Sequence, residues 1–205
     1  MKEYPSIQGP SKAPRDQGIA FYKYDGSNLR WEWQKKNGWC KYGTRHRLFD
    51  ETDEVFGEAI KIFKETVAPQ IDPILRKEYR DAQIITVYTE FFGDKSFAGQ
   101  HVKDDPKKLI LFDVEIYKKG FISPREFVKN FSWKLDIAAK AIYEGNLNDE
   151  FIRKVRKNEF IPPLNEGVVF KGGSGHKLWM TKIKTESYLN KLQEFFGGEW
   201  TKYGE

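Results

Sequence analysis

A lysine stands in the middle of an aromatic segment near the start of the chain, AFYKYDGSNLRW over residues 20–31. This residue, Lys23, lies between two tyrosines and is followed by Asp25 and Gly26, a pair that is typical of a tight turn. Lysine is normally solvated, so a lysine between aromatic side chains either extends its ammonium group to water or serves as a reactive amine. Taken alone, Lys-x-Asp-Gly indicates only a charged residue beside a turn.

Five further segments carry charged or aromatic residues that could act together with this lysine. They are KYGTRHRLF (41–49), VYTEFFG (87–93), LFDVEIY (111–117), EGVVFKG (166–172) and LWMTKIK (178–184). Each has an ordinary structural explanation by itself: a phenylalanine in such a strand is usually a core residue, and two lysines two positions apart usually form a solvated strand face. The segments are informative as an ordered set.

The ordered set resembles the motif series of the covalent nucleotidyltransferase superfamily, which contains ATP-dependent RNA and DNA ligases and mRNA capping enzymes. Lys23-Tyr24-Asp25-Gly26-Ser27-Asn28 is similar to the nucleophile motif, and the other segments follow in the right order and at the right spacing, over about residues 4–191. The resemblance implies an α+β, ATP-grasp-like adenylation domain with an antiparallel sheet and flanking helices. It further implies one nucleotidyltransferase domain over residues 1–205. The chain departs from DNA ligases and capping enzymes in that only 21 residues follow Lys184, so we expect no OB-fold domain.

The resemblance also implies a role for each residue. The superfamily transfers AMP from ATP to the lysine amine, and Lys23 takes that place here. Glu166 is expected to hold a hydrated Mg²⁺, Glu90 to contact ribose hydroxyls and Phe112 to stack on adenine. The implied catalytic residues are Lys23, Lys182 and Lys184, and the implied nucleotide contacts are Tyr22, Asp25, Asn28, Arg45 (with Arg47 as the alternative), Glu90, Phe112, Glu166, Lys182 and Lys184.

A lysine must lose its proton before its amine can attack phosphorus, and the pKa of a free lysine is about 10.4. Burial and a nearby cation both disfavour the charged form. Tyr22 and Tyr24 are expected to provide the burial, and Lys182 or Lys184 the cation. The sequence therefore predicts a lowered pKa for Lys23.

Two positions bear on the substrate. RNA ligases of the phage and editing type commonly carry asparagine where this chain has Asn28, whereas DNA ligases commonly carry arginine. Many DNA ligases also place a glutamate two residues before the lysine, against the adenine, and this chain has Phe21 there. The expected preference for ATP rather than GTP therefore rests on the resemblance alone. We predict an ATP- and Mg²⁺-dependent RNA ligase of the viral or phage type. It would join 3′-OH and 5′-phosphate ends of RNA strands through lysyl-AMP and an adenylated 5′ end.

Other functions stay open at this point. The nearest alternative is a minimal ATP-dependent DNA ligase that seals nicks, which makes nicked duplexes or DNA the alternative substrates. A capping guanylyltransferase is disfavoured, because few residues follow Lys184 and the C-terminal domain that such enzymes use in their first step is missing. A non-catalytic nucleotide- or RNA-binding protein belongs to a different class, and the intact Lys23, Glu166 and Lys182 argue against it.

Composition agrees with a folded nucleic-acid enzyme. The chain has 205 residues, 16% aromatic residues and a net charge of +5, which suits rings that stack on bases and cations that meet phosphates. Cys40 is the only cysteine, so an internal disulfide is excluded and a cysteine-based zinc site is disfavoured. No apolar run has the length of a membrane span and the N-terminus lacks a signal-peptide core, so we expect a cytoplasmic protein without membrane contact, in the host cytoplasm if the source is viral.

The expected strands and helices do not follow a βαβ alternation, so a dinucleotide-binding fold is not indicated. Strands are predicted within 19–33, around a turn at 25–27, and at 82–93, 109–117, 166–173 and 176–184, with a hairpin at Asn37-Gly38; helices are predicted over 53–80 with a break or bend at Pro69 and Pro73, over 124–144, over 148–158 and from Thr185 onwards.

Overall fold

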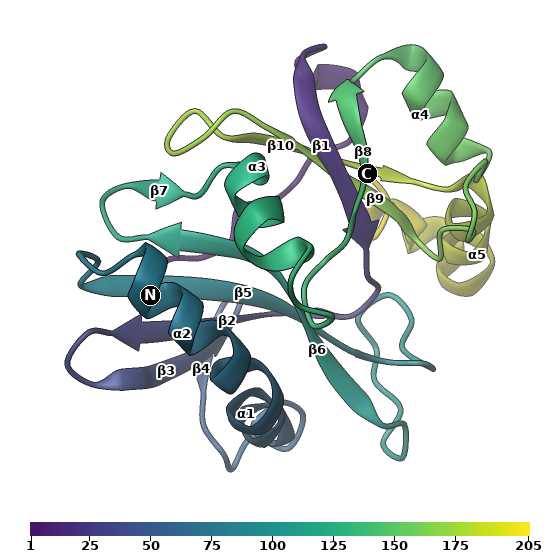
Figure 1. Ribbon diagram of the computed structural model, residues 1–205. Helices are drawn as coiled ribbons and strands as arrows, with labels where there is room; N and C mark the ends of the chain where they lie inside the picture. The colour runs from purple at the N-terminus through teal and green to yellow at the C-terminus, as the bar shows by residue number, and fades with distance from the viewer.

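Two antiparallel sheets form the centre of the computed structural model, which describes residues 1–205 (Figure 1). The six-stranded sheet has the order β4-β3-β2-β5-β6-β7 and the four-stranded sheet the order β10-β9-β1-β8. The strands are β1 Gln17–Lys23, β2 Ser27–Gln34, β3 Gly38–Thr44, β4 Leu48–Phe49, β5 Ile84–Gly93, β6 Lys107–Ile116, β7 Gly120–Phe121, β8 Ala141–Asn146, β9 Gly167–Gly172 and β10 Trp179–Lys184. The predicted α+β class with an antiparallel sheet core is confirmed.

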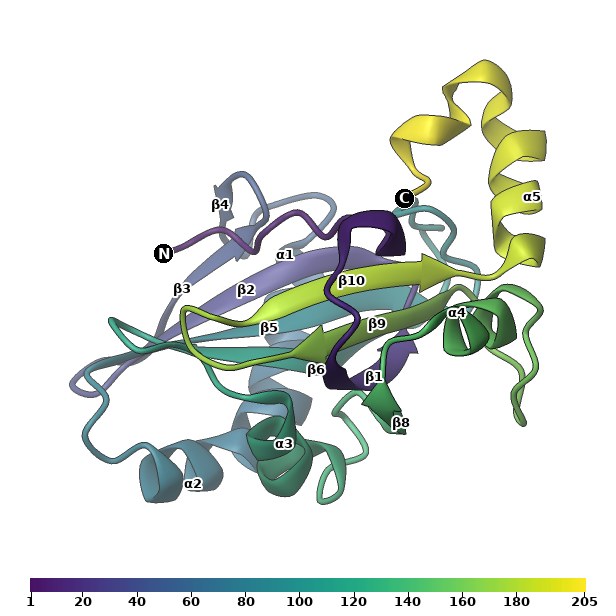
Figure 2. The same cartoon turned by 90° about the horizontal axis from the view of Figure 1, so that it is seen from above.

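Helices cover one face of the six-stranded sheet and enclose the main core. The first helical run comprises α1 (Gly57–Ile62), a π-helical segment and α2 (Ala68–Glu78), and α3 (Pro124–Phe127) continues into a second π-helical segment. Figure 2 shows α2 and α3 on the same side of the sheets. Trp31 on β2 stacks on Phe63 of the first run with ring centroids 4.0 Å apart, and both side chains are fully buried. This contact joins the sheet to its helical cover.

The four-stranded sheet has a smaller core of its own beneath α4 (Asp149–Arg156). Asn148 caps this helix by accepting from the Phe151 backbone N–H. The last strand, β10, leads directly into α5 (Glu186–Phe196), where the Thr185 side chain accepts from the Tyr188 N–H. The predicted start of this helix at Thr185 is confirmed. No helix of the structure has both the length and the apolar character needed to cross a membrane.

The helix predicted over residues 124–144 is present only in its first part. Residues 124–132 are helical, but the predicted helix over 124–144 does not continue, because residues 141–146 form β8. β8 pairs with β1 from Gln17↔Asn146 to Phe21↔Ala141. Without β8 this edge of β1 would leave its backbone N–H and C=O groups unpaired, so a tertiary pairing overrides the local helical pattern.

Of the predicted break or bend at the two prolines, the break is wrong. The chain stays helical from Gly57 to Glu78, and the change of helix type comes just before Pro69. Pro69 stands in the first turn of α2, where proline's fixed φ is tolerated, and Pro73 lies inside the helix. The preceding segment, Phe63–Val67, is π-helical. Such segments have hydrogen bonds between residues five apart and occur as short insertions within α-helices.

We expect Trp31→Ala to lower the free energy of unfolding by about 3–5 kcal/mol, because it removes a fully buried ring and leaves a cavity against Phe63. Trp133→Ala is the matched control, since that ring is 78% exposed and should change the same quantity by less than about 0.5 kcal/mol. Urea denaturation measures both. Equal losses for the two variants would contradict this account of the core.

Candidate active site

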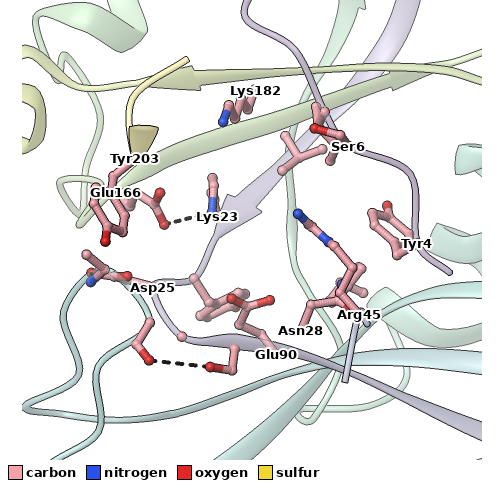
Figure 3. Close-up of a pocket in the computed structure, with 18 of the residues that line it drawn as sticks. Tyr4, Ser6, Lys23, Asp25, Asn28, Arg45, Glu90, Glu166, Lys182 and Tyr203 are labelled. Atoms are coloured by element: carbon pink, nitrogen blue, oxygen red, sulfur yellow. Dashed lines mark hydrogen bonds and ion pairs between the residues drawn. The ribbon is translucent and has the colours of Figure 1, made fainter. Parts of the chain in front are cut away.

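A pocket of about 620 Å³ lies at the seam between the two sheets (Figure 3). It is lined from both sheets, from the N-terminal segment, from the turn between β3 and β4, and from the C-terminal segment. All the residues predicted from the sequence line it: Tyr22, Lys23, Asp25, Asn28, Arg45, Glu90, Phe112, Glu166, Lys182 and Lys184, as does the alternative Arg47. The structure therefore brings the whole set together, and the role of each residue stays a prediction.

The link between β1 and β2 places Lys23 at this seam. Lys23 is the last residue of β1 in the four-stranded sheet, and Ser27 begins β2 in the six-stranded sheet. The three residues between them carry the chain from one sheet to the other. Gly26 is required there, since a Cβ at this position would lie 2.2 Å from the Phe91 carbonyl oxygen. The turn predicted from Asp-Gly is thus the crossing point between the sheets.

The registers of three strands then bring two lysines to one carboxylate. Gly167 at the start of β9 pairs with Lys23 on one side and with Lys184 on the other. The residue before it, Glu166, accepts an ion pair from each: Lys23 Nζ lies 2.9 Å from Oε2, and Lys184 Nζ lies 2.8 Å from Oε1. Gly167 is needed here because a Cβ would lie 2.0 Å from the Ile183 carbonyl oxygen. Both oxygens of Glu166, whose side chain is 2% exposed, are therefore occupied by ammonium groups.

The predicted lowering of the Lys23 pKa is wrong. Burial lowers the pKa of Lys23, but the negative charges of Glu166 and then Glu90 outweigh it, so the pKa lies above its usual value. The pKa of Glu166 is correspondingly lowered, because its two lysines outweigh the effect of burial. The lysine whose pKa is lowered is Lys182, through burial and then through the charges of Lys184 and Lys23.

Glu90 is a second carboxyl group in the pocket, and its environment differs from that of Glu166. It lies on β5 opposite Asn28 of β2. Burial raises the pKa of Glu90 to about 7; Lys23 opposes this rise, and the charges of Glu166 and Asp25 add to it. Near neutral pH this carboxyl group therefore exists partly as a neutral hydrogen-bond donor, a form suited to contact with hydroxyl groups.

Two buried polar atoms in the pocket lining lack a protein partner, namely Asn28 Oδ1 and Arg45 Nε. Buried polar atoms are nearly always paired, so these two point to a ligand that offers both donors and acceptors. Arg47 is instead engaged in an ion pair with Asp53. Arg45 is thus the better candidate of the two arginines for a phosphate contact.

The Asp25 carboxylate is already hydrogen-bonded to other parts of the protein. Its Oδ2 accepts from the Tyr188 hydroxyl at 2.7 Å and from the Ala98 backbone N–H at 3.0 Å. These bonds tie the crossing point between the sheets to α5 and to the loop after β5. Burial, followed by the charge of Glu166, raises the pKa of Asp25. Its predicted contact with a nucleotide is therefore the one that the geometry supports least.

The sequence reasoning missed several residues that shape the pocket. Tyr4 and Lys171 line it beside Phe112, and Tyr203 lines it near Glu166. The Tyr203 backbone carbonyl accepts from Lys184 Nζ at 2.7 Å. A contact made by a carbonyl leaves no signature in residue type, so no sequence signal could have revealed it. Lys171 does carry a signal, since it ends the apolar run of the segment EGVVFK.

The carboxylates in the pocket suit a magnesium ion that is bound partly by substrate phosphates. No group of three or more histidine, cysteine, aspartate or glutamate side chains could hold a metal ion. Mg²⁺ is commonly held by one or two carboxylates together with waters and substrate phosphates, and dedicated protein cages are uncommon. Glu166 and Glu90 fit that mode and would be the carboxylates that hold such an ion. The site thus fits a metal that arrives with phosphates.

Comparison with known proteins gives structural neighbours only. No protein-family model matches the sequence, and no curated protein matches it. The RNA ligase of Naegleria gruberi, in a mutant form with AMP and Mn, is similar with a TM-score of 0.64 and 15% identity over 93% of this chain and 58% of that chain. An archaeal ATP-dependent RNA ligase also has a TM-score of 0.64, with 15% identity over 95% and 51% of the two chains. The N. gruberi ligase with PPi gives 0.60, with 16% identity over 95% and 60%.

These neighbours identify the fold. This chain spans about 51–60% of their length, so the similarity concerns one part of each of those ligases. At 15–16% identity it concerns the arrangement of the backbone rather than the residues of the site. The chain therefore has the fold of the part of these RNA ligases that it matches.

We expect Glu90→Gln to raise the melting temperature more at about pH 8 than at about pH 5. With a pKa of about 7, the folded protein retains a proton that the unfolded chain, with its usual value of 4.5, has already released. The stability that this proton provides is therefore lost as the pH rises through that window, and glutamine has no such proton to lose. Thermal unfolding of both proteins across the pH range measures the difference. A difference that stays constant with pH would contradict the raised pKa.

Proposed function

We propose that this chain is the nucleotidyltransferase domain of an ATP-dependent RNA ligase and that Lys23 is the residue that becomes adenylated. The observation that carries the proposal is the pairing of Lys23 with the buried Glu166 inside a pocket that collects every residue of the predicted motif series. The fold shared with RNA ligases, solved with AMP and Mn in one case and with ATP and Mn in another, supports it.

In the proposed reaction, Lys23 Nζ forms a bond to the α-phosphorus of ATP while the bond from that phosphorus to the departing pyrophosphate breaks. Lys23 must first release a proton to solvent water, and the ion pair with Glu166 disfavours that release because it keeps the pKa of Lys23 above its usual value. A Mg²⁺ ion held by Glu166 and the phosphates would supply positive charge that neutralises the phosphates. It would also weaken the attraction between Glu166 and the ammonium group of Lys23. Weaker pairing with Glu166 would lower the pKa of Lys23 and leave its amine free to attack.

Lys182 and Lys184 provide the positive charge that the α-phosphate requires. They stand two residues apart on β10, on one face of the strand, and both line the pocket. Lys184 is 6% exposed and is already positioned by Glu166. Cations fixed in advance beside a site of developing negative charge stabilise the transition state without reorganisation. Arg45, with its unpaired Nε, serves the phosphates from the opposite sheet.

We expect Lys23→Ala and Lys23→Arg to abolish covalent labelling of the protein by α-labelled ATP. Alanine lacks the amine, and a guanidinium group stays protonated. Lys35→Ala is the matched control, because that lysine is exposed on the hairpin after β2, and this variant should label like the wild type. Denaturing electrophoresis after incubation with ATP or GTP and Mg²⁺ measures the adduct. Label retained on Lys23→Ala would overturn the proposal.

Glu166→Gln separates two explanations of how Lys23 is activated. The substitution removes the largest charge that raises the pKa of Lys23, so Lys23 should lose its proton more readily. If deprotonation alone limited the reaction, this variant would become labelled faster. We expect labelling to fall by at least about 100-fold instead, as for loss of a positioned electrostatic group, because the carboxylate also holds Lys184 and the metal. Rates of labelling across a pH series decide between the two.

The preference for RNA rests on Asn28 and is the finer part of the proposal. Its side-chain oxygen is buried in the pocket without a partner, so it is available to a hydroxyl donor. A 2′-hydroxyl is the group that distinguishes RNA from DNA at a given site. We expect Asn28→Ala to slow joining of RNA strands more than it slows self-adenylation. We also expect strands ending in a 3′ ribonucleotide to seal faster than matched all-DNA nicks. Equal sealing rates would favour the minimal DNA ligase.

A further inference from the structure

Lys171 is a buried lysine beside the pocket that the proposed reaction does not use. It lies on β9, where its side chain is 5% exposed, and pairs with Asp113 of β6, which is 3% exposed, at 2.8 Å. The pair joins the two sheets. Burying an ammonium group is costly, and an apolar pair of similar size often packs as well. The position of the pair therefore calls for a reason other than packing.

The strand that carries Asp113 has a β-bulge at Phe112. In the pairing of β5 with β6, Tyr88 lies opposite Asp113 and Thr89 lies opposite Leu111, so Phe112 has no partner residue. Bulges leave the extra residue outside the ladder and redirect its side chain, often next to active sites. The Phe112 carbonyl, freed from the ladder, accepts from Lys171 Nζ at 2.8 Å. Lys171 thus supplies the donor that the bulge requires.

Tyr4 holds the same bulge from the opposite side. Its hydroxyl donates to Asp113 Oδ2 at 2.8 Å, the oxygen that also pairs with Lys171. Its ring meets the Phe112 ring edge-on, with centroids 5.1 Å apart and an interplanar angle of 84°. Tyr4 is 3% exposed. Phe112 is therefore fixed at its carbonyl by an ammonium group and at its ring by an aromatic edge.

We propose that Lys171 and Asp113 are positioning residues that hold the bulged Phe112 with its ring toward the pocket, and that they thereby set the affinity for the nucleobase of ATP. The inference rests on the proposed function, in which Phe112 stacks on adenine. Methionine can fill the volume of Lys171 but cannot donate to the freed carbonyl. The ammonium group also lies over three aromatic rings, those of Phe21, Phe112 and Phe127, at 5.4, 5.6 and 5.8 Å from the ring centroids.

The test uses the double variant Lys171→Met/Asp113→Asn in the full chain. Removing both charges avoids an orphaned buried charge, and asparagine still accepts from Tyr4. We expect the KM for ATP in self-adenylation to rise at least about tenfold, as for loss of a charge-assisted hydrogen bond, while the rate at saturating ATP changes little. Inhibition by inorganic tripolyphosphate, which has no base, should be unchanged.

The control is Lys107→Met/Asp105→Asn. The side chains of this pair are only 2% and 3% exposed, and Lys107 lies on the same strand as Asp113, but neither residue lines the pocket. It should leave the KM for ATP unchanged. Tyr4→Phe is a second test variant that keeps the ring and loses only the hydroxyl, and we expect a rise of about fivefold in the KM for ATP. It keeps the inference testable should the double variant fail to fold.

The outcomes distinguish this inference from the function on which it rests. A wild-type protein that is never labelled by ATP overturns the proposed function and this inference with it. A labelled wild type whose test variants show an unchanged KM for ATP overturns this inference alone. An equal loss of affinity for ATP and for tripolyphosphate also overturns it, because the defect would then lie in the whole pocket and not at the base.

Discussion

The structure depends on one buried carboxylate that two lysines share. Glu166 binds Lys23 through one oxygen and Lys184 through the other, and its side chain is almost fully enclosed. Breaking such a buried pair by removing one partner typically costs about 3–5 kcal/mol. The carboxylate therefore holds β1, β9 and β10 in register at the pocket, and it also raises the pKa of Lys23, the proposed nucleophile.

The arrangement of the two sheets places Lys23 beside this carboxylate. The chain crosses from one sheet to the other directly after Lys23, so the amine lies where residues from both sheets can reach it. The four-stranded sheet contributes the lysines and Glu166. The six-stranded sheet contributes Asn28, Glu90 and the bulged Phe112. Both walls of the pocket therefore carry charged groups toward the proposed nucleotide, since Arg45 and Glu90 belong to the six-stranded side and Lys182 and Lys184 to the four-stranded side.

Sequence predicted most of the strands and which residues meet in one pocket, and it failed where contacts are non-local. Motif order placed Lys23, Glu90 and Glu166 in one pocket although they are distant along the chain. It could not show that Glu166 raises the pKa of Lys23, because that depends on a strand register and not on flanking tyrosines. The predicted helix over 124–144 failed for a related reason, since only the free edge of β1 makes residues 141–146 a strand.

The central claim is that Lys23 alone accepts AMP, and mapping the adduct tests it most directly. The wild-type protein would be incubated with ATP and Mg²⁺, digested, and its peptides sequenced by mass spectrometry under conditions that preserve a phosphoamide bond. The account predicts AMP on the peptide that contains Lys23 and on no other. AMP on Lys182 or Lys184, or the absence of any adduct on a protein that binds ATP, would contradict it.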